Sequence, residues 1–127
     1  DSGVLCLAPG ATVLGAVTVR PGASLVADRA NILGSVTTDR AVTVDLSHTV
    51  IVGTLTVKRS TGTVTVSGNQ VLGVVTVSGN TTGGDPTLIA GNSVLGLLSC
   101  DGNQPPPVNG GVHNLVLGLK SGQCRKL

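Results

Sequence analysis

A motif of two aliphatic residues followed by glycine recurs along the chain at a nearly constant interval. The interval ranges from 19 residues, between Gly15 and Gly34, to 23 residues, between Gly73 and Gly96. A unit this short cannot bury its own apolar side chains, so successive copies must stack as they do in solenoid proteins. The repeated glycines are Gly15, Gly34, Gly53, Gly73, Gly96 and Gly118.

Each glycine is followed by a short segment, most often of the form x-V-T-V, and a second β-branched segment lies between successive copies, as at 41–46 and 63–66. Segments in which β-branched residues alternate with period two, bounded by Gly and Asn, are typical of strands. No stretch has a helical period. The sequence therefore predicts an all-β, single-domain parallel β-helix of about six coils of roughly 19 to 23 residues. This length fits a right-handed, three-faced coil better than the left-handed hexapeptide type. An antiparallel sandwich or barrel would not explain why the copies recur about every 20 residues.

One solenoid domain is expected over residues 1–127, with an N-terminal coil at 1–11, regular coils at 12–99 and a C-terminal coil at 100–127. Hydrophobic residues make up 40% of the chain, but Phe, Tyr, Trp and Met are absent. The core must therefore be built from Val, Leu, Ile and Ala.

Aligning the copies on the glycine predicts which side chains share a column, and strand alternation predicts which columns face inward. The inward columns are expected to be Val13, Ile32, Ile51, Val71, Val94 and Val116; Val17, Val36, Leu55, Val75 and Leu98; Val19, Thr38, Val57, Val77 and Cys100; Cys6, Leu25, Val44, Val64 and Thr87; and Ala8, Ala27, Leu46, Val66 and Ile89.

One column of the opposite parity is aliphatic, although a solvent-facing column should be polar. Two interpretations stay open: the chain bends at the glycine and partly buries this column, or the column is a lateral contact surface. Its members are Leu14, Leu33, Val52, Leu72, Leu95 and Leu117, and beside it run Ala16, Ser35, Thr54, Val74, Leu97 and Leu119.

Corners are predicted where Gly-Asn pairs follow strands, as at 68–69, 79–80, 91–92 and 102–103. Glycine permits a left-handed backbone there, and the Asn side chains are expected to bond local backbone or that of the adjacent coil. The glycines of the main repeat would instead allow a bend or a close approach that a Cβ would obstruct. Longer segments at 59–62, 80–85 and 103–111 should project from one corner as inert loops or as partner contacts.

Three cysteines are present, and the register places Cys100 and Cys124 one coil apart near a shared corner. A disulfide between them would staple the last coil and indicates an oxidising location, secreted or at the cell surface. Cys6 lies about four coils from Cys100, too far for a bridge within the chain. It is expected to be a buried free thiol, with an intermolecular bridge as the alternative.

The charged residues favour no catalytic site. Asp occurs six times and Glu never, and Arg20, Asp39 and Lys58 align as a surface ladder of alternating sign. We expect no enzyme activity, no catalytic residue, no metal site and no cofactor. A net charge of +2 without aromatic residues argues against nucleic-acid binding, and no apolar run is long enough to span a membrane.

The chain resembles secreted actinobacterial proteins of unassigned function that carry repeats of V-x-G-x-V-x-V and a C-x-G-N…G-Q-C ending. The matching residues here are Cys100-Asp101-Gly102-Asn103 and Gly122-Gln123-Cys124. Asn often follows the repeat glycine in those proteins, whereas Ala16, Val74 and Leu97 stand there in this chain, among others. In architecture and aliphatic composition the chain is also similar to bactofilins, which are polymer-forming β-helices.

These features predict an extracellular structural protein that self-assembles into filaments or layers through its ends and its outward aliphatic column. The alternative is a binding module for extracellular or cell-wall polysaccharide that uses the stacked corner loops. A third possibility is an ice-binding face made by the column of Thr18, Thr37, Thr56 and Thr76.

Overall fold

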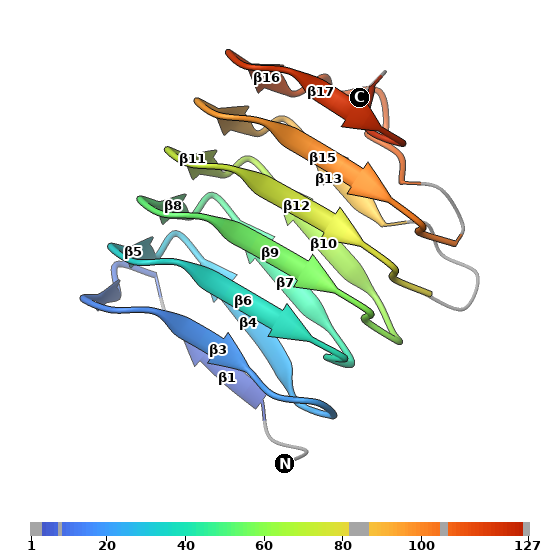
Figure 1. Ribbon diagram of the computed structural model, residues 1–127. Coiled ribbons are helices and arrows are strands. Elements are labelled where there is room, and N and C mark those ends of the chain that lie inside the picture. Colours follow the sequence, from blue (N-terminus) through green and yellow to red (C-terminus); the bar gives the residue numbers. More distant parts are fainter. Residues whose placement is uncertain (1–3, 8, 82–86, 105–106, 126–127) are drawn as a thin grey trace.

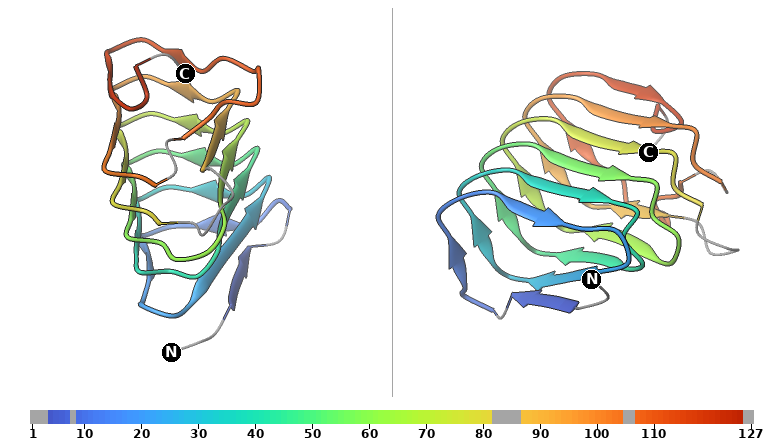
Figure 2. Two further views of the ribbon diagram at one scale, coloured as in Figure 1. Left: turned by 90° about the vertical axis from the view of Figure 1, so that its right-hand side faces the viewer. Right: turned by 60° about the horizontal axis from the view of Figure 1, so that its bottom comes forward.

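The computed structural model describes residues 4–7, 9–81, 87–104 and 107–125. In this part of the chain every regular element is a strand, and the strands form three parallel sheets of five, six and six strands. The sheets stack into a solenoid of about five turns with the two termini at opposite ends (Figures 1 and 2). The predicted all-β solenoid is therefore confirmed, and its coil count is close to the six expected.

We name the sheets A, B and C in the order in which the chain meets them. Sheet A contains β1 (Val4–Leu7), β4 (Ser24–Asp28), β7 (Val44–Ser47), β10 (Val64–Ser67) and β13 (Leu88–Ala90). Sheet B contains β2 (Thr12–Val13), β5 (Asn31–Ile32), β8 (Val50–Ile51), β11 (Gln70–Val71), β14 (Ser93–Val94) and β16 (Leu115–Val116). Sheet C contains β3 (Val17–Val19), β6 (Val36–Asp39), β9 (Leu55–Lys58), β12 (Val75–Ser78), β15 (Leu98–Asp101) and β17 (Lys120–Gly122).

The coil is right-handed, as predicted. In Figure 1 the strands of sheet C run from left to right in front, those of sheet A return behind them, and each turn lies above the preceding one. This is the hand that parallel crossovers take almost always, because of the right-handed twist of each strand.

The core runs along the axis of the coil and consists mainly of the predicted inward columns, together with Ala30 and Ala41. Val13 and Val116, at the two ends of their column, are only partly buried. Along β9, for example, Leu55 and Val57 are fully buried, whereas Thr56 is only partly buried. The register stacks Val36, Leu55, Val75 and Leu98 directly on one another. Each β-branched or leucine side chain therefore packs against like neighbours above and below, which stabilises a repeat unable to fold alone.

The predicted column through Cys6 is wrong in the first coil. Cys6 pairs with Val26 and Leu7 with Ala27, so β1 is shifted by one residue from the expected alignment. Four residues separate Leu7 from Thr12, whereas only three separate their partners Ala27 and Asn31. Because a shift of one residue exchanges the two faces of a strand, Cys6 is exposed rather than buried. Ala8, expected in the neighbouring column, lies outside the described residues.

The glycines of the repeat lie one above another where sheet B passes into sheet C. Gly73 N–H donates to Gly53 O at 3.1 Å, and Gly96 N–H donates to Gly73 O at 3.0 Å. A Cβ on Gly73 would lie 2.5 Å from Gly53 O. The close approach expected from the sequence is therefore confirmed, and it excludes a side chain at this position in each stacked coil.

Asparagines form two buried stacks along the other two corners. Asn69, Asn92 and Asn114 make one, in which Asn69 Nδ2 donates to Asn92 Oδ1 at 3.0 Å and Asn92 Nδ2 donates to Asn114 Oδ1 at 2.9 Å. Asn80 and Asn103 make the other, joined at 2.7 Å. The amides also donate to backbone carbonyls of the neighbouring coil, as predicted. Glycines with positive φ precede four of these residues: Gly68, Gly79, Gly91 and Gly102.

Three buried hydroxyl oxygens have no hydrogen-bond partner among the described residues: those of Thr38, Ser60 and Thr87. Thr38 lies in β6 with Val19 and Val57 as its cross-strand neighbours. A buried hydroxyl without a partner loses its bonds to water and gains none.

The Thr38→Val variant should therefore be more stable than the wild type by about 1 kcal/mol, because valine keeps the shape and removes the unpaired hydroxyl. Urea unfolding followed by far-UV circular dichroism measures this change in a chain that lacks aromatic fluorophores. Thr37→Val is the matched control, since Thr37 points outward on the same strand and is exposed. Equal effects in both variants would contradict the explanation.

Candidate functional surfaces

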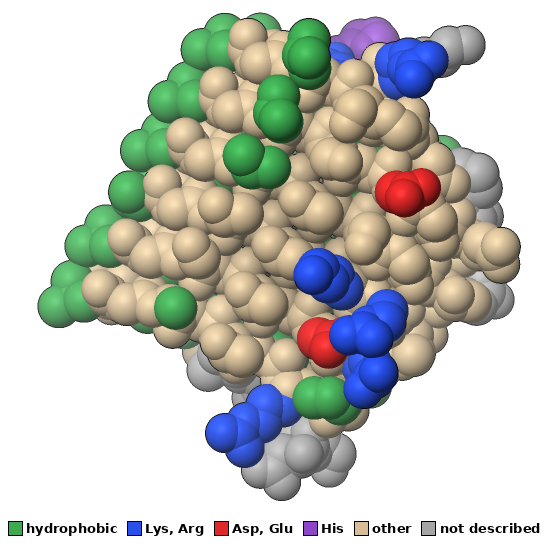
Figure 3. All heavy atoms as spheres, in the orientation of Figure 1, with side chains coloured by type: hydrophobic (Ala, Val, Ile, Leu, Met, Phe, Trp, Pro, Cys, Tyr) green, Lys and Arg blue, Asp and Glu red, His purple; other side chains and the backbone are tan. Residues whose placement is uncertain are grey.

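A row of exposed aliphatic side chains runs the length of the solenoid beside the stacked glycines. We call it the aliphatic ridge, and it lies along the left edge of the molecule in Figure 3. Its side chains extend from the first described coil to the last, so the column expected to face outward is exposed throughout. The exposed fractions are 81% for Leu14, 47% for Leu33, 40% for Val52, 43% for Leu72, 50% for Leu95 and 68% for Leu117.

The ridge broadens toward the C-terminal coils. Leu97 and Leu119, two residues after the ridge leucines of their coils, are 43% and 71% exposed. Leu115, on the sheet B side, is 63% exposed. No Lys, Arg, Asp or His lies in the ridge or in the column of Leu97 and Leu119. The structure thus presents a continuous uncharged apolar surface, of the kind that marks interaction sites on soluble proteins.

The C-terminal coil is closed by a disulfide between Cys100 and Cys124, as predicted. Their Cα atoms lie 5.1 Å apart, and both residues are fully buried. The two cysteines are 24 residues apart in the sequence. Closing a loop of this length in the unfolded chain contributes on the order of 3 kcal/mol to stability.

The register of the same coil places Lys120 in a column that is otherwise apolar. Lys120 pairs with Leu98, which pairs with Val75, and it is only partly buried. A further coil stacked in register on β17 would bury its ammonium group in the core, at a cost of several kcal/mol. The glycine repeat could have revealed this position, because Lys120 follows Gly118 as Leu98 follows Gly96.

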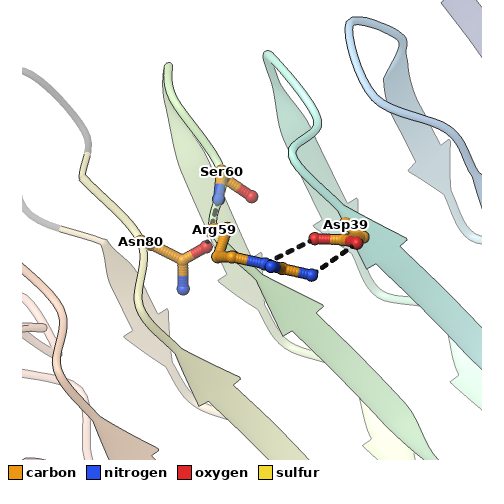
Figure 4. A network of polar contacts seen from close by, with 4 residues as sticks. All are labelled: Asp39, Arg59, Ser60 and Asn80. Carbon is orange, nitrogen blue, oxygen red and sulfur yellow. Dashed lines mark hydrogen bonds and ion pairs between the residues drawn. The ribbon is translucent and has the colours of Figure 1, made fainter.

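The predicted charge ladder is rearranged. Asp39 is the cross-strand neighbour of Lys58, as expected, but its ion pair is with Arg59. Arg59 Nε and Nη2 donate to the two carboxylate oxygens at 2.8 and 2.7 Å (Figure 4). The planar guanidinium makes two parallel bonds from two nitrogens to the two oxygens, a geometry that a single ammonium nitrogen cannot match. Both side chains are substantially exposed, so this pair contributes little to stability.

Two of the predicted loops, at 80–85 and 103–111, lie only partly within the described residues. Residues 82–85 of the first of these and 105–106 of the second fall outside them. In the second loop Val108 is exposed, while its N–H donates to Thr87 O and its carbonyl accepts from Ile89 N–H. This part of the loop therefore packs along sheet A.

Within the residues that the structure describes, no group of three His, Cys or Asp side chains is placed to hold a metal ion. In the same residues, no helix is long and apolar enough to cross a membrane.

Comparison with protein-family models, curated proteins and solved structures found no match for this chain. The resemblance to secreted actinobacterial proteins and to bactofilins therefore stays a prediction. The solenoid fold and its disulfide stand on the structure itself.

Proposed function

We propose that the protein is an extracellular structural protein that self-associates side by side through the aliphatic ridge. The observation that carries this proposal is the unbroken row of six exposed aliphatic residues in successive coils. A solvated strand face normally carries polar residues, so an apolar column repeated in every coil calls for something to cover it.

The size of the surface supports a protein partner. The exposed parts of the six ridge residues together with Leu97 and Leu119 amount to roughly 800 Å², which is about one partner's share of a standard interface. The surface carries no charge, so an uncharged partner can cover it without burying an unpaired ion.

A second copy of this chain fits the ridge better than an unrelated surface. The ridge side chains repeat at the strand spacing of about 4.8 Å, and a second copy presents the same spacing. Rows with equal spacing can interdigitate along their whole length, as identical side chains do in dry sheet interfaces.

Lys120 limits the direction of growth. Since a coil added on β17 would bury its ammonium group, association through this end is unfavourable. The sequence predicted association both through the ends of the solenoid and through its sides. We now propose association through the sides. The disulfide supports an extracellular setting, because such bonds persist in oxidising compartments.

The Leu33→Gln/Leu72→Gln variant tests the proposal. Sedimentation velocity over a range of micromolar concentrations should show oligomers for the wild type and association weakened at least about tenfold for the variant, because two central apolar contacts are lost. The matched control is Val42→Gln/Val112→Gln, in which the replaced valines are 42% and 54% exposed but lie off the ridge. A monomeric wild type, or equal weakening in the control, would overturn the proposal.

A further inference from the structure

Among the residues that the structure describes, four other than glycine have a left-handed backbone, and all four are Arg or His. Their φ angles are 54° for Arg29, 57° for Arg40, 51° for His48 and 53° for Arg59. This conformation costs a residue with a Cβ about 1 to 2 kcal/mol relative to the right-handed one, whereas glycine adopts it freely. Only ten of the 127 residues are Lys, Arg or His, so the coincidence of strain with basic side chains is notable.

Glycine occupies the same corner positions in later coils. Arg59 N–H donates to Ser78 O, and Gly79 N–H donates to Asp101 O, so Arg59 and Gly79 are equivalent in successive coils. In the same way His48 is equivalent to Gly68. The fold therefore accepts glycine at these corners, yet four early coil corners keep a strained basic residue. Strain retained where a relaxed residue would serve points to a role for the side chain.

Two of the strained arginines belong to a cluster, which we call the basic corner: Arg20, Arg40, Lys58 and Arg59. All four residues are exposed, and they lie where sheet C passes into sheet A. Arg40 N–H donates to Lys58 O at 3.0 Å, which holds these two residues side by side. Asp39 precedes Arg40 in the chain and is the cross-strand neighbour of Lys58. Through its two bonds to Arg59, Asp39 orients that guanidinium along the solenoid axis (Figure 4).

Figure 3 shows basic side chains gathered on the lower right of this face, away from the aliphatic ridge on the left. Arg20 and Lys58 stand two coils apart in one column, about 10 Å at strand spacing, while Arg40 and Arg59 are neighbours in the next column. The cations thus follow the straight axis of the rod rather than surrounding a pocket. Such an arrangement suits an extended ligand with repeated negative charges.

We propose that the basic corner binds an acidic polysaccharide laid along the solenoid axis. Nucleic acid is disfavoured because no aromatic side chain is available for base stacking. An anionic membrane is disfavoured because basic residues that hold a protein on a membrane act beside inserted apolar ones, and the aliphatic ridge lies on a different edge. The disulfide supports an oxidising location, where acidic polysaccharides are accessible partners.

The Arg40→Gly/Arg59→Gly variant separates ligand binding from folding. Glycine relieves the left-handed strain, so the variant should unfold at an equal or higher temperature than the wild type. Its affinity for heparin, used as the acidic polysaccharide, should fall roughly tenfold at low salt because two contacting cations are lost. Surface plasmon resonance on immobilised heparin measures the affinity, and thermal unfolding by circular dichroism measures the stability.

Arg125→Gln/Lys126→Gln is the charge-matched control, because it removes two cations that follow β17 in the sequence and do not belong to the basic corner, and it should keep wild-type heparin affinity. Leu33→Gln/Leu72→Gln should also keep it, since the ridge lies elsewhere, so this inference can fail or succeed independently of self-association. Equal loss in the charge-matched control, no binding by the wild type, or tighter binding to duplex DNA or to anionic vesicles than to heparin would overturn the proposal.

Discussion

Gly73→Ala should destabilise the solenoid by about 3 kcal/mol or more, the cost of forcing a methyl group into closely packed backbone. The new Cβ would lie 2.5 Å from Gly53 O and 3.0 Å from Gly53 C, both of which are backbone atoms. The chain can relieve this clash only by separating two coils. Separation would lengthen the hydrogen bond from Gly73 N–H to Gly53 O, now 3.1 Å. It would also disturb the hydrogen bond that Gly96 N–H donates to Gly73 O.

Gly15→Ala is the matched control for Gly73→Ala. Gly15 is the first member of the same stack, and nothing lies within 4 Å of the Cβ that the substitution would add. The φ of Gly15 is not in the left-handed region. Alanine should therefore be neutral or stabilise the protein by up to about 1 kcal/mol, because it lowers the conformational entropy of the unfolded chain. Urea unfolding followed by circular dichroism should therefore separate the two variants clearly. Similar midpoints would show that close coil contact does not explain the repeat.

Asn92→Ala should destabilise the protein by about 4 kcal/mol, because it leaves several buried polar groups without partners. Asn92 Oδ1 accepts from both the backbone N–H and Nδ2 of Asn69, at 2.9 and 3.0 Å. Its Nδ2 donates to Val66 O and to Asn114 Oδ1, each at 2.9 Å. The amide thus joins three successive coils in a region from which water is excluded.

The control for Asn92→Ala is Asn31→Ala, at an exposed position of β5. We expect the control to change the free energy of unfolding by less than about 0.5 kcal/mol. Amide hydrogen exchange adds a local measurement: the N–H groups of Thr49 and Asn69, which donate to asparagine side chains of the same stack, should lose protection in Asn92→Ala. A loss below about 1 kcal/mol would mean that the stack adds little to stability.

The regular coils could be predicted closely because periodicity is a local property that stacking repeats. Once the glycines are aligned, strand alternation predicts that Leu55 faces inward and Leu72 outward. In the structure Leu55 is fully buried and Leu72 is exposed. The disulfide followed from the same alignment, since Cys100 and Cys124 fall one coil apart. The bonds from the corner Asn side chains to backbone were predicted, but the burial of these side chains and the bonds between their amides from coil to coil were not.

The first coil and the corners were harder to predict. The predicted alignment of Cys6 was wrong by one residue, because four residues separate Leu7 from Thr12 whereas three separate Ala27 from Asn31. A connection between strands can hold an extra residue without a break in the apolar pattern. The partner of Asp39 also differed from prediction. Strand alignment points to Lys58, but side-chain reach and the planar guanidinium select Arg59.

The sequence by itself determined the circumference of the coil, the composition of its core and the aliphatic column on its surface, because one glycine-marked repeat specifies each of them. Only the tertiary structure decided how far that column is exposed and which corners hold a strained arginine. The physical reason is that exposure and corner conformation depend on neighbouring coils about 20 residues away.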